Sequence, residues 1–232
     1  MDLLLEALRE AWRLLLTGDA DVYDVTLRTA LITGTSTALS TVVGVPAGLA
    51  IALARFPGQR WLVALSNAGM GMPPVVAGLI VSMLLWRSGP FGSLGLIYTP
   101  AAMVIAQVVI ATPLIIAVSA GAVMALPPTL HLQIRAMGAG TFQYLYLVAR
   151  EARLPLLVAV MAGFGSVISE VGASMMVGGN LAGDTRVLTT AAVLEVSRGR
   201  FGTALALGII LLILVLAIAI LLTVAQQRQQ RR

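Results

Sequence analysis

The sequence Trp61-Leu-Val-Ala-Leu-Ser-Asn-Ala-Gly-Met-Gly-Met-Pro-Pro-Val-Val-Ala-Gly-Leu-Ile-Val-Ser-Met-Leu-Leu-Trp86 contains no charged side chain over 26 residues. A second uncharged run of 26 residues extends from Thr29 to Ala54. A helix rises about 1.5 Å per residue, so either run is longer than the hydrocarbon core of a bilayer, which is about 30 Å thick. Backbone groups in lipid must bond within their own segment. Both runs therefore predict membrane-spanning helices.

Composition extends this prediction to the whole chain. Hydrophobic residues make up 59% of the sequence and charged residues 11%, with a mean hydropathy of +0.96, whereas a soluble domain has about 25% charged residues. The chain has no cysteine, which excludes thiolate chemistry and Cys-based metal sites. We predict an all-α membrane protein with about five transmembrane helices, at about residues 26–54, 61–86, 99–125, 154–177 and 201–225.

The N-terminal segment, residues 1–20, has a different character. Leucines and Trp12 fall on one helical stripe, and Glu6, Arg9 and Glu10 interrupt the apolar run. An interfacial helix that lies on the bilayer is the simplest interpretation, and packing of this helix on the bundle is the alternative. Residues 21–232 are expected to form a single transmembrane domain.

Arginine placement predicts the orientation, because cytoplasmic loops carry an excess of basic residues. With the N-terminus outside, the inner side holds eight arginines and the outer side seven. We therefore expect an external N-terminus and a cytoplasmic C-terminus. The net charge of +5 is explained by such loops, so no nucleic-acid partner is expected. The inner arginines are Arg55, Arg60, Arg135, Arg150, Arg153, Arg228, Arg231 and Arg232.

A polar loop at residues 131–153 separates the third and fourth predicted spans and falls on the cytoplasmic side. The stretch is amphipathic, and Gly138 divides it into two helical pieces. A short helix exposed beneath a bundle is a suitable docking element for a soluble partner.

Glu170 places a carboxylate in the otherwise apolar fourth span, within Ile168-Ser-Glu-Val-Gly-Ala173. A charge at mid-membrane costs about 2.5 kcal/mol or more, so it marks a bundle interior or a pathway. A carboxylate repels a dianion unless it is protonated or paired, so a pathway role implies pairing with an arginine such as Arg186. We favour a structural role, in which Glu170 holds two helices together through a hydrogen bond.

The next segment, Gly178-Gly-Asn-Leu-Ala-Gly-Asp-Thr-Arg186, is a Gly-rich polar turn. Backbone N–H groups and a guanidinium suit a tetrahedral oxyanion. Gly178, Gly179 and Asn180 form either an anion-receptive nest or a tight turn, and we favour the turn. Thr185 and Arg186 either contact an anion near the outer gate or simply end the loop.

Two further pairs of residues are candidates for the same route. Thr189 and Thr190 begin a short helix, where hydroxyls more often cap or bond locally than bind a ligand. Pro73 and Pro74 interrupt the second span and are expected to kink or unwind it. Such a break shapes the helix, and it could also expose carbonyl groups to a pathway.

A membrane-embedded enzyme is the competing class. A serine protease would need a serine with a membrane-facing His or Lys, but the single histidine, His131, lies in a loop and the chain has no lysine. An aspartyl protease would need two aspartates in spans, and the predicted spans contain none. The sequence therefore disfavours an enzyme.

Several motifs resemble the permease subunits of ABC importers. Met137-Gly-Ala139 and Leu154-Pro155 are similar to the Gly step and the end of the family's cytoplasmic loop. Leu132, Gln133 and Ile134 stand where that loop begins Glu-Ala-Ala, and the interval from Gly to Pro is about one helical turn longer than usual. The branch for molybdate, tungstate and sulfate is indicated by Thr26-Leu-Arg-Thr29 and by Gly44-Val-Pro-Ala-Gly-Leu-Ala-Ile-Ala-Leu-Ala-Arg55. Tungstate-uptake permeases are most similar at Gly71–Leu79, Ser88–Gly92, Ile168–Ala173, Val177–Asn180 and Thr185–Thr190.

This resemblance, which covers residues 22–225, implies a type I ABC importer permease fold in a multi-pass protein of the inner cell membrane. It implies a homodimer with the pathway on its two-fold axis and tungstate as the cargo, with molybdate or another oxyanion as the alternative. Partners would be a cytoplasmic ABC ATPase dimer and an extracytoplasmic oxyanion-binding protein. The chain lacks a GxxxxGK[ST] phosphate loop, so it would bind no cofactor itself, and ATP and Mg would bind to the ATPase.

The resemblance also implies residue roles. The coupling helix within loop 131–153 would contact the ATPase through Arg135, Gly138, Ala139, Phe142, Tyr146, Arg150 and Glu151. The substrate pathway would involve Pro73, Pro74, Glu170, Gly178, Gly179, Asn180, Thr185, Arg186, Thr189 and Thr190.

Overall fold

The structure is a computed structural model that describes residues 2–17, 20–54 and 56–230. Arg55, Arg231 and Arg232, which the orientation argument counts, lie outside the described residues, as do residues 18–19 of the N-terminal segment. The elements are, in chain order, α1 (Asp2–Thr17), α2 (Ala20–Leu53), α3 (Gln59–Met70), α4 (Pro74–Leu85), η1 (Gly92–Leu94), α5 (Pro100–Met124), α6 (Pro128–Ala136), α7 (Thr141–Glu151), α8 (Arg153–Ile168), α9 (Gly172–Gly178), α10 (Leu188–Ser197) and α11 (Phe201–Gln230).

The described residues are all-α, as predicted. Three helices, α2, α5 and α11, are long and apolar enough to cross a membrane. The second predicted span is present but broken, because α3 and α4 meet at an angle of 100°. Pro73 lies in the break and Pro74 is the first residue of α4, which confirms the predicted interruption. The helix α8 follows α7 at an angle of 71°, so counting each bent pair as one span gives five.

The fourth span differs from the prediction of one helix over residues 154–177. The helix α8 ends at Ile168, and α9 begins at Gly172. The Ser169 hydroxyl donates to the Gly165 carbonyl (2.8 Å), and the Glu170 carboxylate accepts the Ala173 N–H (2.8 Å). Polar side chains that bond to local backbone groups compete with a continuous helix, and here they accompany a break inside the apolar run.

The longest helix, α2, packs through small and polar residues. Its buried stripe contains hydroxyl-bearing residues such as Ser36 and Ser40, together with Gly44 and Gly48. A Cβ at Gly44 would lie 2.7 Å from the Ile115 side chain of α5, and one at Gly48 would lie 2.7 Å from Ser119. Small residues let membrane helices approach closely, so α2 crosses directly on α5. The opposite side of α2 exposes large apolar side chains suited to lipid, among them Leu27, Leu31, Leu39, Val42 and Val43.

A buried hydrogen-bonded chain joins three helices inside this core. Ser36 of α2 donates to the Gln107 Oε1 of α5 (2.8 Å), and the Gln107 amide donates to Ser174 of α9 (3.4 Å). All three side chains are buried. Because lipid offers no alternative partner, these bonds fix the relative placement of α2, α5 and α9.

The N-terminal helix α1 packs on the bundle, which was the alternative interpretation of residues 1–20, and its position at the bilayer surface stays a prediction. Leu14 is buried in a cluster with Val25 of α2 and with Leu207 and Ile210 of α11. The helix therefore packs on the bundle. It also leaves an apolar side exposed, as an interfacial helix does, at Leu5, Leu8, Trp12 and Leu16.

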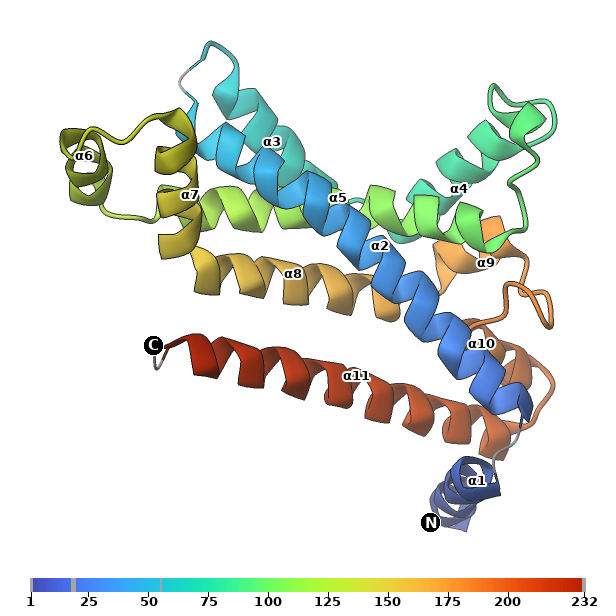
Figure 1. Cartoon of the computed structure of the whole chain (residues 1–232). Coiled ribbons are helices and arrows are strands. Elements are labelled where there is room, and N and C mark those ends of the chain that lie inside the picture. The colour runs from blue at the N-terminus through green and yellow to red at the C-terminus, as the bar shows by residue number, and fades with distance from the viewer. Residues whose placement is uncertain (1, 18–19, 55, 231–232) are drawn as a thin grey trace.

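The elements gather at two ends of the bundle (Figure 1). The helices α6 and α7 lie at one end, on the same side of the picture as the C-terminal end of α11. The helices α1, α9 and α10 lie at the opposite end. Both regions that the sequence singles out, the loop at 131–153 and the turn at 178–186, are thus separated by the length of α8.

Candidate functional site

The first candidate region is the elbow, which we define as residues 128–151, comprising α6, α7 and the link between them. Gly138 has a φ of +75°, and its N–H bonds to the Arg135 carbonyl (3.0 Å). Only glycine adopts this backbone conformation readily. The structure therefore confirms that Gly138 separates two helical pieces.

One side of the elbow is fixed to the bundle. Ile134 of α6 and Val148 of α7 are buried in a cluster with Leu49, Val123 and Leu156 of the neighbouring helices, and Ala139 packs against it. This apolar contact, rather than the flexible link, sets how α6 and α7 project. The elbow is therefore a rigid extension of the ends of α2, α5 and α8.

Polar contacts between the two helices add to this rigidity. The Tyr144 hydroxyl lies 2.9 Å from Nδ1 of His131, and the Arg135 guanidinium lies 5.2 Å from the centre of the Tyr144 ring. At the start of α7, the Gln143 side chain accepts the Gly140 N–H (3.1 Å). The two Tyr144 contacts hold α6 against α7 beside the apolar cluster, against which Tyr144 also packs.

The outer side of the elbow is apolar and uncovered. Phe142 and Met137 are 88% and 84% exposed, and Leu132 and Tyr146 are exposed as well. Large apolar side chains clustered on a surface mark an interaction site. Of the predicted contact residues, Arg135, Gly138, Phe142, Tyr146, Arg150 and Glu151 are exposed, whereas Ala139 is partly buried.

A groove lies next to this patch. It has a volume of about 540 Å³ and lies between α6 and the α7–α8 junction. Arg150, Glu151 and Arg153 contribute charged side chains to its lining, and Ile134 and Met137 contribute apolar ones. The elbow thus offers both a projecting patch and an adjacent recess with charge of both signs.

The second candidate region is at the other end, around Glu170. Its carboxylate accepts the N–H of Ala173 in the first turn of α9, and its carbonyl accepts the Thr189 hydroxyl of α10 (3.3 Å). Glu170 thereby connects α8, α9 and α10, which agrees with the structural role we favoured. Among the described residues its carboxylate forms no ion pair with Arg186.

The turn at residues 178–186 is closed on itself. The Thr185 hydroxyl donates to the Gly178 carbonyl (2.5 Å) and accepts the Leu181 N–H (2.9 Å), and Thr185 is fully buried. The N–H groups of residues 184, 185 and 186 all bond to the Leu181 carbonyl, and the Gly179 N–H bonds to Met175. Because these donors are used internally, the geometry favours a tight turn over an anion-receptive nest.

Close packing explains the composition of this turn. Gly179 and Asn180 have φ values of +70° and +54°. A Cβ at Gly178 would lie 2.8 Å from the Met103 sulfur, and one at Gly179 would lie 2.8 Å from the Tyr98 ring. The Asn180 amide donates to the Thr190 carbonyl (3.4 Å). The glycines are therefore required by backbone conformation and by the approach of α5 and its leading loop.

The two threonines of α10 are buried, and only Thr190 bonds within its own turn, since the Thr189 hydroxyl donates to the Glu170 carbonyl. Thr190 exchanges hydrogen bonds with the backbone N–H and carbonyl of Val187, each at 3.1 Å. Thr29 of α2 accepts the Leu188 N–H (2.9 Å) and so caps α10 from another helix. Thr190 thus bonds locally as expected, whereas the Thr189 hydroxyl reaches a residue 19 positions away.

Arg186 turns toward α1 and α11. Its guanidinium donates to the Asn180 carbonyl (3.3 Å), while its own carbonyl accepts a hydrogen bond from Arg28 (3.2 Å). Its side chain lines a pocket of about 330 Å³ together with Glu10, Glu195 and Arg200. Acidic groups share this pocket with the basic ones, so its charge is mixed. Direct contact of Arg186 with an anion stays a prediction.

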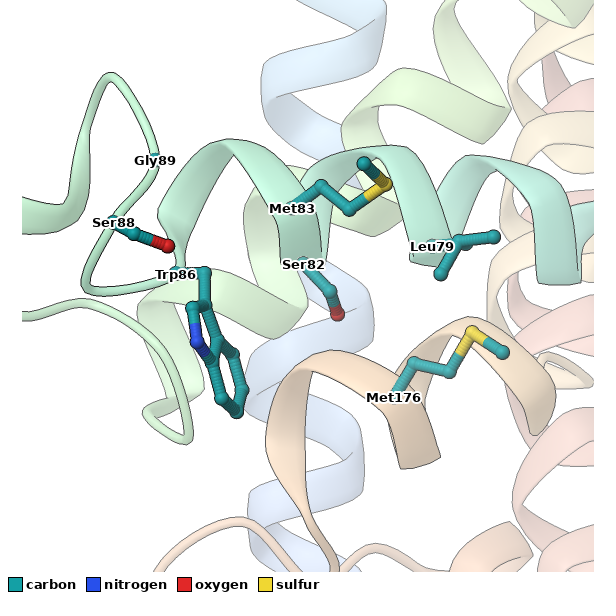
Figure 2. Close-up of a pocket in the computed structure, with 7 residues that line it drawn as sticks. All are labelled: Leu79, Ser82, Met83, Trp86, Ser88, Gly89 and Met176. Carbon is teal, nitrogen blue, oxygen red and sulfur yellow. The ribbon is translucent and has the colours of Figure 1, made fainter.

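Another pocket, of about 490 Å³, lies between α4 and α9. Figure 2 shows Met176 of α9 opposite Leu79 and Ser82 of α4, with Trp86 at the end of α4. The Ser82 hydroxyl is buried and has no partner among the described residues. None of the ten predicted pathway residues lines this pocket, so their pathway role also stays a prediction.

Sequence reasoning missed three features. Met137 immediately precedes Gly138, at the end of α6. An apolar residue at such a helix end could have been expected to be exposed. Gln107 was visible as a polar residue inside a span, but its partners on α2 and α9 were not. The hydroxyl cap from Thr29 to α10 carries no local signal, because the two residues are 159 positions apart.

Comparison with known proteins gives a consistent result. The family described as "Binding-protein-dependent transport system inner membrane component" matches residues 44–232. A "Probable anion ABC transporter permease protein" of Haloferax volcanii is 39% identical over 80% of this chain and 82% of its own length. A "Tungstate uptake system permease protein TupB" of Peptoclostridium acidaminophilum is 34% identical over 90% of this chain and 92% of its own length. An inward-facing structure of the MetNI methionine ABC transporter matches with a TM-score of 0.71 and 22% identity, over 88% of this chain and 93% of that one.

Proposed function

Because this chain belongs to the family of binding-protein-dependent transport system inner membrane components, we propose that two copies of it form the transmembrane pathway of a tungstate importer. The chain is a permease subunit and not an enzyme, and its fold is that of type I ABC importer permeases. The energy for transport comes from ATP hydrolysis by a separate subunit, on which ATP and Mg would bind.

The observation that carries this proposal is the exposed patch of the elbow. Phe142, Met137 and Tyr146 project from helices that are otherwise fixed to the bundle. Aromatic and Met side chains are enriched in the centres of protein interfaces. The patch is therefore suited to a cytoplasmic ABC ATPase, with Arg135, Arg150 and Glu151 at its rim.

The fold suggests how movement of the ATPase would reach the pathway. The elbow is packed against α8 through Val148 and Leu156. At its other end, α8 is joined through Glu170 to both α9 and α10. A displacement of the elbow would therefore rotate α8 and so move α9 relative to α4. Two copies related by a two-fold axis would open alternately to each side as the ATPase dimer closes and opens.

The orientation follows from the same surface. Arg135, Arg150 and Arg153 belong to the elbow end, which we assign to the cytoplasm. The α9–α10 end and the N-terminus then lie outside, where an oxyanion-binding protein would deliver its cargo. The C-terminal end of α11, on the same side of Figure 1 as the elbow, would be cytoplasmic.

Tungstate is proposed on the strength of the relatives. Tungstate and molybdate have nearly the same size and charge, so hydrogen bonds in a pathway would hardly separate them. Selection between them is therefore assigned to the binding protein. Molybdate or another oxyanion is the alternative cargo.

The test is uptake into vesicles that contain this permease with the ATPase and binding protein encoded beside it. ATP is supplied on the side of the membrane that carries the ATPase. Labelled tungstate, molybdate and sulfate are added in turn on the opposite side, and their uptake is compared. We expect ATP-dependent tungstate uptake that is lost without the ATPase. Uptake of molybdate alone would contradict the assignment of tungstate as the substrate but would agree with the assignment as an oxyanion importer. Failure of the permease to bind the ATPase would overturn the coupling role of the elbow.

A further inference from the structure

The helix α3 carries an unusual exposed stripe. Arg60, Ala64, Asn67 and Gly71 recur at intervals of four, three and four residues, so they share one side of the helix. All four are exposed. A separate exposed stripe contains Trp61 and Leu65, which have the large apolar side chains expected against lipid. The two stripes lie on adjacent sides of α3.

Asn67 is the decisive residue of the first stripe, which we call the Asn67 stripe. It lies eight residues after Gln59, the first residue of α3, which corresponds to a rise of about 12 Å into the broken span. Its side-chain amide has no hydrogen-bond partner among the described residues. An unsatisfied amide in hydrocarbon costs several kcal/mol, so this stripe cannot face lipid.

The break at the end of α3 supports the same conclusion. Residues 71–73 are non-helical, and Gly71 is exposed on the Asn67 stripe. Irregular backbone at membrane depth is tolerated only inside protein or beside a water-filled cavity. Two independent features, a side chain and a stretch of backbone, thus require the same polar surroundings.

Arg60 adds a positive charge to the cytoplasmic end of the Asn67 stripe. It stands at the elbow end of the stripe and forms no ion pair among the described residues. Because Arg60 lies in the first turn of α3, at the end of the span, its charge can stay hydrated at the membrane surface. A water-filled space leaves it solvated and places a positive charge at the mouth.

Several other polar side chains of the membrane region already have hydrogen-bond partners within the protein. Ser36, Gln107 and Ser174 bond to one another inside the core. Ser66, beside Asn67, donates to the Leu62 carbonyl (2.9 Å). Asn67 therefore retains free amide donors that a passing solute can use.

We propose that the Asn67 stripe of α3 lines the water-filled route of the assembled transporter, where the Asn67 amide donates hydrogen bonds to the oxyanion and Arg60 attracts it toward the cytoplasmic mouth. The inference rests on the proposed function for its cargo and orientation. Neutral donors suit such a route, because an ion must bind well enough to enter and weakly enough to leave.

The experiment uses the absence of cysteine from the sequence. Asn67→Cys places a single thiol on the stripe, and Leu65→Cys is the matched control on the lipid side of α3. Each variant is assembled with the ATPase in vesicles. A charged methanethiosulfonate is applied from both sides, with and without ATP, and labelling of the permease is measured by mass spectrometry.

A charged reagent reaches only thiols that contact water, and it reacts with the thiolate. We expect the Asn67→Cys thiol to react at least about tenfold faster than the control in one of the two nucleotide states, and millimolar tungstate to slow it. Equal and slow reaction in both states would overturn the proposal. Fast labelling that no oxyanion slows would support water access to the stripe but would contradict the proposed hydrogen bond between Asn67 and the oxyanion.

A second pair of variants tests the anion contact by charge. Asn67→Asp keeps the shape but adds a negative charge, which should reduce uptake at least about tenfold while ATPase binding is retained. Asn67→Ser keeps a neutral donor and should transport better than Asn67→Asp. Unchanged uptake by Asn67→Asp would overturn the proposal. If wild-type vesicles transport molybdate but not tungstate, the substrate assignment fails, and the thiol experiment is read with molybdate.

Discussion

At the elbow end, Phe142 and Met137 project almost completely into the surroundings, whereas Thr185 and Thr190 at the other end are completely buried. The sequence marks both ends as candidate sites. In the elbow, apolar side chains are left without partners while the backbone is held rigid. In the far turn, polar side chains use their hydrogen-bonding groups on the turn itself. The elbow is therefore a surface suited to contact with a second molecule, whereas the turn at residues 178–186 satisfies its polar groups within the protein.

The largest expected effect tests whether the exposed patch of the elbow binds the ATPase. Phe142→Asp places a charge in the exposed patch and should weaken ATPase binding by about 30-fold or more, because central aromatic contacts contribute about 2 kcal/mol or more. The matched control is Phe91→Asp, the same change at an exposed phenylalanine outside the elbow. Titration of purified ATPase against each variant measures the difference. Equal affinities for both variants would remove the elbow from the interface.

A smaller effect is expected at the far turn. Thr185→Val removes the hydroxyl that pairs with the Gly178 carbonyl and the Leu181 N–H. Leaving such groups unpaired costs about 1–3 kcal/mol, which lowers Tm by about 2–10 °C in a chain of this size. Thermal unfolding in detergent should show this loss, with ATPase affinity unchanged. Thr185→Ser keeps the hydroxyl and should remain close to the wild type.

Substitutions of Glu170 can separate the role of its negative charge from the role of its hydrogen bond to the start of α9. Glu170→Gln preserves an oxygen that can accept the Ala173 N–H, whereas Glu170→Ala removes it. Loss of a helix cap costs about 1 kcal/mol. We therefore expect Glu170→Ala to unfold at a lower temperature than Glu170→Gln, and Glu170→Gln to retain most of the uptake. Loss of uptake in Glu170→Gln, with its stability retained, would instead assign a function to the charge itself.

The smallest effect concerns the inner side of the elbow. Tyr144→Phe removes the hydroxyl that lies 2.9 Å from His131 but keeps the ring beneath Arg135. A typical hydrogen bond contributes about 0.5–1.5 kcal/mol, so ATPase affinity should fall by less than about tenfold. Titration of purified ATPase measures this affinity, and hydrogen exchange of the α6 and α7 amides shows whether the elbow itself is loosened. An effect as large as that of Phe142→Asp would place Tyr144 in the interface itself.

Local sequence signals predicted the elements well where one residue type determines the backbone. Gly138 separates α6 from α7 because it adopts a positive φ, and Pro73–Pro74 interrupts the second span because proline lacks an N–H. The break at Glu170 was not predicted. The run around it is apolar, and nothing local shows that its carboxylate cap and its bond from Thr189 together accompany an interrupted helix.

The candidate sites were predicted unequally. The pathway role predicted for the polar residues at 178–190 stays a prediction. In the structure they bond to one another, to Glu170 and to Thr29, contacts that only the tertiary packing shows. For the elbow, the sequence located the helices, and the structure identified which of their residues are uncovered. Asn67 was overlooked because a single amide in a long apolar run gives no sign of which way it faces.

The sequence by itself determined that this protein is an all-α membrane protein, because uncharged runs longer than the bilayer can satisfy their backbone only as helices. It also determined where glycine and proline interrupt those helices. Only the tertiary structure decided which polar groups are occupied and which remain free. Hydrogen bonds such as Thr29 to Leu188 and Ser36 to Gln107 join residues far apart in the chain, and the packing of α2 on α5 brings them within reach.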